Sequence, residues 1–106
     1  MELRQFPRFP VHCPIVFYRD DTRAEGTMVD VSMSGCGVES TARLAQGNYG
    51  VLLLHLPEHD PPVQVDVAVV RWAREQRCGL QFLRMRPEEK ERFHRFIGTF
   101  DRKPSP

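Results

Sequence analysis

Short apolar runs with a period of two, each ended by turn-forming residues, constrain the fold of this chain more than any other feature. In the first run Val11, Cys13, Ile15 and Phe17 share one face of an expected strand. Further alternating or continuous apolar runs cover residues 27–32, 38–40, 51–56, 63–72 and 79–83. Polar, glycine or proline clusters separate these runs. The pattern predicts about six short antiparallel strands.

Two positions interrupt the regular alternation. Pro14 lies inside the first run and cannot donate to a strand ladder, which indicates an edge position or a bulge. Further on, the alternating valines of residues 63–69 occupy one face, whereas Val70 and Trp72 continue on the other. This change of face predicts a bulge, or burial on both faces, near Val70.

The last part of the chain has a helical period instead. Pro87 suits the first turn of a helix, and glutamates follow it near the positive end of the helix dipole. Phe93, Phe96, Ile97 and Phe100 are spaced at i, i+3, i+4 and i+7, so they form one apolar stripe. The sequence therefore predicts a C-terminal helix that packs on the strands.

Together these elements fit one domain, since the chain has 106 residues. The expected fold is mainly β, a small antiparallel six-stranded β-barrel with a C-terminal α-helix. Residues 1–10 are expected to form an N-terminal arm, residues 11–100 the barrel with its helix, and residues 101–106 a tail.

Composition narrows the classes of function. The longest apolar run, residues 51–54, is far too short to cross a membrane, and the N-terminus lacks the pattern of a secretory signal. We therefore expect a cytoplasmic protein without membrane insertion.

The three cysteines are widely spaced without a C-x-x-C pair, which favours reduced thiols packed as small hydrophobes. His55 and His59 have a metal-like spacing, but Pro57 prevents the helix that would align them, so no metal site is expected.

Charge and motif content point away from nucleic acids and catalysis. The net charge of +1 argues against a long DNA or RNA partner. From Arg71 onward ten Lys or Arg residues accompany five Asp or Glu residues, which is compatible with a small anion that carries two phosphates. There is no nucleophile elbow or glycine-rich phosphate loop, so we expect no catalytic residues. A barrel that binds single-stranded nucleic acid remains an alternative, which a salt titration with a random oligonucleotide tests.

Arg4 and Arg8 form the first candidate binding pair. They flank Phe6 in a segment that Pro7 stiffens, where a helix is not expected. Two guanidiniums on a short segment present planar donor forks that match phosphate oxygens or the O6 and N7 acceptors of guanine. The alternative is a pair of solvated arginines that keep the arm soluble.

Asp30, Ser32 and Gly35 form the second candidate set, in the pattern D-x-S-x-x-G. Period two places Asp30 and Ser32 on one face of a strand. A carboxylate accepts hydrogen bonds from the N1–H and N2–H₂ groups of guanine, and a serine hydroxyl can donate or accept beside it. Gly35 leaves room for a turn or a ligand. The alternative is that these polar side chains only cap a turn.

In this order the two sets resemble the motifs of the PilZ domain family, the bacterial receptors for cyclic di-GMP. The first stands here as Arg4-Gln5-Phe6-Pro7-Arg8, and the second begins 22 positions after Arg8. The segments Val69-Val70-Arg71-Trp72 and Gly79-Leu80-Gln81-Phe82 also resemble later barrel strands of the family. The resemblance covers roughly residues 3–85, and the helix also fits.

The resemblance implies a non-enzymatic, ligand-binding switch without a cofactor. Arg4 and Arg8 would hold the phosphates and a guanine edge of cyclic di-GMP, Asp30 and Ser32 would hold a guanine, and Gly35 would shape the turn. Trp72 would be a further ligand contact by stacking, although barrel packing is an equal alternative. Family members that bind two stacked ligand molecules often have an arginine where this chain has Leu3, which favours one molecule per site.

An unidentified protein effector would then receive the signal, in motility, biofilm or exopolysaccharide control. The alternative function is a PilZ-like adaptor that contacts proteins without binding the nucleotide.

Overall fold

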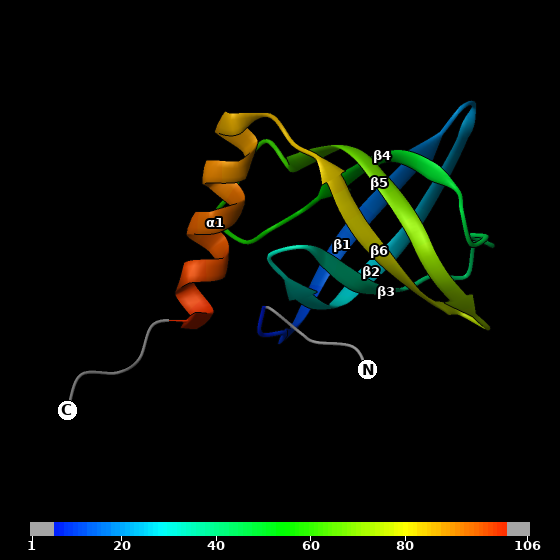
Figure 1. Ribbon diagram of the computed structural model, residues 1–106, viewed down its shortest axis with the longest axis horizontal. Coiled ribbons are helices and arrows are strands. Elements are labelled where there is room, and N and C mark those ends of the chain that lie inside the picture. The colour runs from blue at the N-terminus through cyan, green and yellow to red at the C-terminus, as the bar shows by residue number, and fades with distance from the viewer. Residues whose placement is uncertain (1–5, 102–106) are drawn as a thin grey trace.

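The computed structural model describes residues 6–101, which form six strands and one helix. In chain order these elements are β1 (Phe9–Arg19), β2 (Thr22–Ser32), β3 (Gly35–Glu39), β4 (Tyr49–Leu54), β5 (Val63–Arg74), β6 (Arg77–Arg84) and α1 (Pro87–Asp101). The strands close into a barrel in the order β1-β2-β3-β6-β5-β4, and every neighbouring pair is antiparallel. The predicted fold, a mainly β barrel with a C-terminal helix, is therefore confirmed. Figure 1 shows α1 at one end of the barrel, away from the tips of the β1–β2 and β5–β6 hairpins.

Three of the strand connections are two-residue turns. They join Arg19 to Thr22, Ser32 to Gly35 and Arg74 to Arg77, and each of these pairs is in register across its hairpin. Asp20 and Glu75, the first residues of two of these turns, adopt φ values of 54° and 57°. Positive φ is typical of two-residue hairpin turns because it matches the right-handed twist of the strands.

Several strands begin earlier than the apolar pattern indicated. β1 begins at Phe9, which pairs with Val31, and β2 reaches back to Thr22. The early part of β2 was missed because Ala24 is its only buried residue. β3 begins at Gly35, which the sequence suggested as part of a turn, and β6 begins at Arg77, because the hairpin turn is two residues long.

The predicted strand irregularities are present. The β1–β2 register shifts between Pro10 and Cys13, directly before Pro14, although β1 is no edge strand because it pairs with both β2 and β4. The β5–β6 register shifts between Val70 and Trp72, where a bulge was one of the two readings. This second shift leaves Val70 buried and both Arg71 and Trp72 exposed.

The interior of the barrel is a single apolar cluster. It includes the three cysteines, which are free thiols at 1–4% exposure. Burial raises the pKa of all three thiols, so they remain protonated at neutral pH. They pack in the core as small hydrophobic side chains, as the sequence indicated.

Helix α1 closes one end of the barrel with its aromatic stripe. Phe93 and Phe96 are buried, and Phe93 meets Phe82 of β6 edge-on, with ring centroids 5.3 Å apart. Phe100 stacks on Phe9 at the start of β1, with centroids 5.4 Å apart. The aromatic stripe therefore connects α1 both to the barrel core and to Phe9, which directly follows Arg8.

A buried carboxylate joins the beginning of α1 to the barrel. Glu89 is 8% exposed and accepts a hydrogen bond of 2.7 Å from the N–H of Gln64 in β5. Arg92 donates to the same carboxylate at 3.0 Å and also to the carbonyl of Pro61. Burial by itself would raise the pKa of Glu89, but these hydrogen bonds and the charge of Arg92 hold it below its ordinary value.

Replacing Glu89 with alanine is expected to lower the free energy of unfolding by about 1–3 kcal/mol at neutral pH, because the Gln64 N–H loses its acceptor. The folded protein binds a proton at Glu89 less readily than the unfolded chain does. This stabilisation is therefore present above the ordinary pKa of 4.5 and is lost as the pH falls through the lower folded pKa. Urea unfolding of the wild type and Glu89→Ala at neutral and acidic pH measures the difference between their free energies of unfolding, which should narrow in acid. An equal difference at both pH values would contradict the role assigned to Glu89.

Candidate functional site

A row of four residues crosses the outer face of the barrel through four strands. Asp30 of β2 pairs with Gly37 of β3, Gly37 pairs with Gly79 of β6, and Gly79 pairs with Trp72 of β5. The residues adjacent to the two glycines, such as Cys36 and Leu80, are buried in the core, so the row lies on the outside. The row thus places a carboxylate and an indole at the two ends of a pair of glycines.

Each glycine lets one neighbouring side chain lie directly on the sheet. A Cβ at Gly37 would come within 2.8 Å of Asp30 Oδ2, and a Cβ at Gly79 would overlap the indole of Trp72. The carboxylate therefore lies over Gly37 of β3 and the indole over Gly79 of β6, on strands about 4.8 Å apart. No other residue type would permit this arrangement without displacing them.

Asp30 forms an ion pair with Arg8 at the Gly37 end of this row. The Gly37 N–H donates to Asp30 Oδ1 at 3.0 Å, and Arg8 Nη2 donates to the same oxygen at 2.5 Å. The Arg8 and Asp30 side chains are 33% and 39% exposed, so the ion pair is accessible to solvent. An exposed pair of this kind is worth about 0–1 kcal/mol, which a bound anion can replace.

The turn between β2 and β3 is organised by Ser32. This residue is only 2% exposed, and its Oγ accepts a hydrogen bond of 3.2 Å from the N–H of Ser34. The turn-capping alternative raised from the sequence thus describes the contacts of Ser32. Gly35 follows with no room for a Cβ, which would overlap the carbonyl of Leu80. The exposed hydroxyl of this turn belongs to Ser34.

The bulge in β5 forms one wall of a cleft that Arg8 and the β2–β3 turn also line. Arg71 and Trp72 both face it, and Arg71 Nε donates to Oε1 of Gln81 on β6. Trp72 is 49% exposed, and its indole lies on Gly79, so it packs on the outer face of the barrel and also faces the cleft. The cleft has a volume of about 410 Å³ and is lined by Arg8, Ser34, Gly35, Cys36, Arg71, Trp72, Gly79, Leu80 and Gln81.

Most of the predicted site residues meet at this cleft. Arg8, Gly35 and Trp72 line it, and Asp30 joins it through Arg8. Ser32 lies beneath the turn, and Arg4 lies outside the described residues.

Sequence reasoning missed six residues of the cleft, of which Ser34, Arg71 and Gln81 have polar side chains. The available signal for Arg71 was the expected bulge, because a bulge can turn consecutive side chains to one side.

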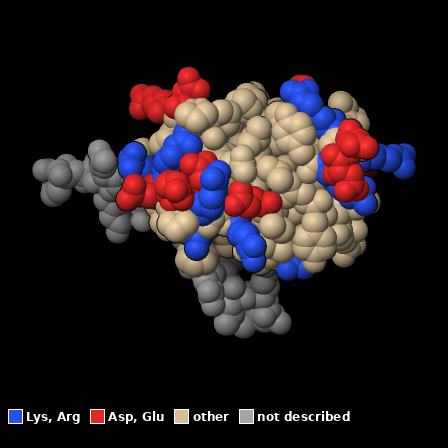
Figure 2. Space-filling model, turned by 90° about the horizontal axis from the view of Figure 1, so that it is seen from above, with Lys and Arg blue, Asp and Glu red and all other residues tan. Residues whose placement is uncertain are grey.

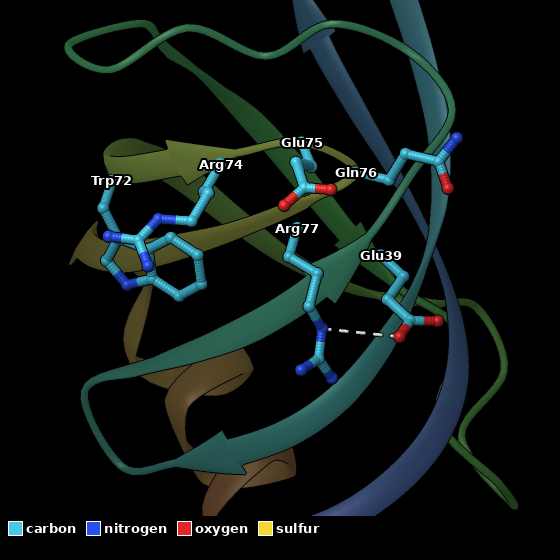
Figure 3. Close-up of a pocket in the computed structure, with 6 residues that line it drawn as sticks. All are labelled: Glu39, Trp72, Arg74, Glu75, Gln76 and Arg77. Carbon is cyan, nitrogen blue, oxygen red and sulfur yellow. Dashed lines mark ion pairs between the residues drawn. The ribbon is translucent and has the colours of Figure 1, made fainter.

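Two larger hollows do not contain the predicted set. One, of about 870 Å³, lies at the β5–β6 hairpin and shares only Trp72 with the cleft; Figure 3 shows its charged side chains, with Arg77 paired to Glu39 at 3.4 Å. The other, of about 660 Å³, is lined by His12, His55 and His59 among others. In the described range, no group of three or more His, Cys, Asp or Glu side chains is placed to hold a metal ion.

Charges of both signs are mixed on the surface. Figure 2 shows acidic and basic side chains side by side at both ends of the view from above, with an uncharged area between them. That face carries no continuous basic band of the kind that binds a long polyanion. Among residues 6–101, no helix is long and apolar enough to span a bilayer.

Solved structures with the same fold are known. The structure of the Bacillus subtilis inhibitor of motility (MotI/DgrA) matches with a TM-score of 0.72 and 15% identity, over 98% of this chain and 55% of that chain. This chain therefore spans about half the length of that protein. The PilZ domain of CeSA from a cellulose-synthesizing bacterium matches with a TM-score of 0.70 and 16% identity, over 91% of this chain and 99% of that one.

A third structure, the PilZ domain with c-di-GMP of YcgR from Escherichia coli, matches with a TM-score of 0.70 and 15% identity, over 94% of this chain and 92% of that one. At such identities the likeness establishes a common fold. No curated protein matches the sequence. A family model described as PilZ domain matches residues 2–98, nearly the whole chain. With this match and the barrel that accompanies it, the chain belongs to the PilZ domain family.

Proposed function

We propose that this chain is a cyclic di-GMP receptor that binds the nucleotide in the cleft between Arg8 and Trp72. The observation that carries the proposal is the Arg8–Asp30 pair, which lies over Gly37 opposite an exposed indole. Domains of this family are receptor and adaptor domains rather than enzymes. The YcgR structure of the same fold is a PilZ domain with c-di-GMP, which supports the choice of ligand.

Each group of the cleft has a matching group on the nucleotide. The guanidinium fork of Arg8 suits a phosphate or the O6 and N7 edge of guanine. Asp30 suits the N1–H and N2–H₂ donors, and the indole of Trp72 offers a stacking face. Ser32 supports these contacts by holding the turn, and Arg4 would add a second fork from the arm.

The energies are sufficient for a physiological affinity. One charge-assisted hydrogen bond contributes about 1.5–3 kcal/mol, and a micromolar complex needs about 8 kcal/mol. Two arginines, one carboxylate and a stacked base reach that value after the cost of ordering the arm. A single ligand molecule per site, as Leu3 suggests, agrees with the modest size of the cleft.

Ligand binding would change the position of the arm and, through it, act on α1. Phe9 follows Arg8 directly and stacks on Phe100, which in turn meets Phe96 edge-on at 5.1 Å. A ligand that draws Arg8 away from Asp30 therefore also acts on the end of the helix. The recipient would be a protein effector, in motility, biofilm or exopolysaccharide control.

Replacing Arg8 with alanine is expected to weaken cyclic di-GMP binding at least about tenfold, equivalent to roughly 1.4 kcal/mol, because a charged ligand contact is lost. Calorimetry with cyclic di-GMP, beside GTP and cyclic di-AMP, measures the affinity, the stoichiometry and the ligand identity together.

The matched control is Arg84→Ala, which removes an exposed arginine of β6 outside the cleft and should bind as the wild type does. If Arg8→Ala binds as tightly as the wild type, Arg8 has no ligand role. If the wild type gives no heat with cyclic di-GMP, the chain is an adaptor that does not bind the nucleotide.

Two variants of Asp30 separate its ligand role from its structural role. Asp30→Asn keeps an oxygen for the Gly37 N–H but cannot accept both guanine donors. We expect binding at least about tenfold weaker, with unfolding changed by less than about 1 kcal/mol. Asp30→Ala leaves the buried Gly37 N–H without its acceptor and should cost about 1–3 kcal/mol of stability as well. Calorimetry and urea unfolding measure the two effects; wild-type affinity in Asp30→Asn would show that the carboxylate does not contact the base.

A further inference from the structure

The bulge in β5 gives the cleft a second guanidinium, from a residue outside the R-x-x-x-R and D-x-S-x-x-G patterns. In a regular strand consecutive side chains point to opposite faces, so Arg71 and Trp72 would lie on different sides of the sheet. The register shift between Val70 and Trp72 places Arg71 as the extra residue, and both side chains line the same cleft. Bulges beside functional sites commonly re-aim a side chain in this way.

Arg71 is held in place by a neutral side chain, that of Gln81. Its Nε donates to Oε1 of Gln81, which leaves the terminal nitrogens of the guanidinium for another acceptor. The ion pairs recorded within residues 6–101 do not include Arg71, whereas Arg8 is paired with Asp30. Among residues 6–101, the cleft thus has the guanidiniums of Arg8 and Arg71, and Asp30 at its edge is engaged by Arg8.

Space for an acceptor lies next to Arg71. Gln81 pairs with Gly35 across the β3–β6 ladder, and both residues line the cleft that Arg71 faces. Ser34, which precedes Gly35, presents its hydroxyl from the turn. A cation fixed in a cleft beside a hydroxyl is a suitable environment for a phosphate oxygen.

We propose that Arg71, positioned by Gln81, binds a phosphate of the nucleotide on the side of the cleft opposite Arg8. The inference rests on the proposed function and deepens it. Arg8 and Arg71 would hold the two phosphates of one cyclic dinucleotide from the two walls. Gln81 is then a positioning residue, because it acts on the ligand only through Arg71.

The test is calorimetry of cyclic di-GMP with Arg71→Ala, Arg71→Lys and the control Arg84→Ala. Arg71→Ala should bind at least about tenfold more weakly. Arg71→Lys should bind with an affinity between those of the wild type and Arg71→Ala, because a lysine keeps the charge but loses the hydrogen bond to Gln81 and the planar fork. The loss in Arg71→Ala should shrink as sodium chloride is raised, because salt screens the charge. Arg84→Ala should match the wild type.

A double-mutant cycle tests the role of Gln81. Gln81→Ala should weaken binding less than Arg71→Ala does, and the double variant should bind no more weakly than Arg71→Ala alone. Additive losses would show that Gln81 acts independently of Arg71. Melting temperatures of all variants identify any loss of folding.

Three outcomes overturn the inference. Wild-type affinity in Arg71→Ala removes Arg71 from the site while the proposed function stands. A loss in Arg71→Ala that stays the same as sodium chloride is raised indicates an uncharged contact with a base, not with a phosphate. A wild-type protein that does not bind cyclic di-GMP overturns the proposed function, and this inference with it.

Discussion

The candidate site depends on glycine at positions 37 and 79, where no side chain covers the backbone. These glycines pair with each other across β3 and β6, and they let Asp30 and Trp72 lie on the backbone from opposite sides. The pairing of β3 with β6 also closes the barrel, since β4 and β5 intervene in the sequence. The same ladder that completes the fold therefore brings together a carboxylate and an indole more than forty residues apart.

The site and the helix share one structural connection. Arg8 reaches the cleft from the residue before β1, and the next residue, Phe9, packs on Phe100 near the end of α1. At its other end α1 is fixed to β5 through the buried Glu89. One end of the helix is thus held by a buried hydrogen-bonded carboxylate, and the other by a more exposed aromatic contact with Phe9, the residue after Arg8. A nucleotide that moves Arg8 would act on the second end first.

The sequence was sufficient for the architecture because the alternating runs and the stripe from Phe93 to Phe100 depend on local periodicity. It was insufficient where a strand has little apolar content, as in β2 before Met28, or where glycines continue a strand, as at Gly35. The motif residues Arg8 and Asp30 were predicted, but the burial of Ser32 and the orientation of Arg71 were not. Both depend on tertiary geometry, a two-residue turn in one case and a bulge in the other.

An NMR titration of the folded domain with cyclic di-GMP determines whether the nucleotide binds at this cleft. If the nucleotide lies over the β3–β6 glycines, the amide signals of Gly35, Gly37 and Gly79 should shift saturably and together. The amide of Gly50 in β4, which is outside the cleft, should stay in place. Saturating nucleotide that leaves the three glycine amides unmoved, or that moves Gly50 instead, would contradict the account.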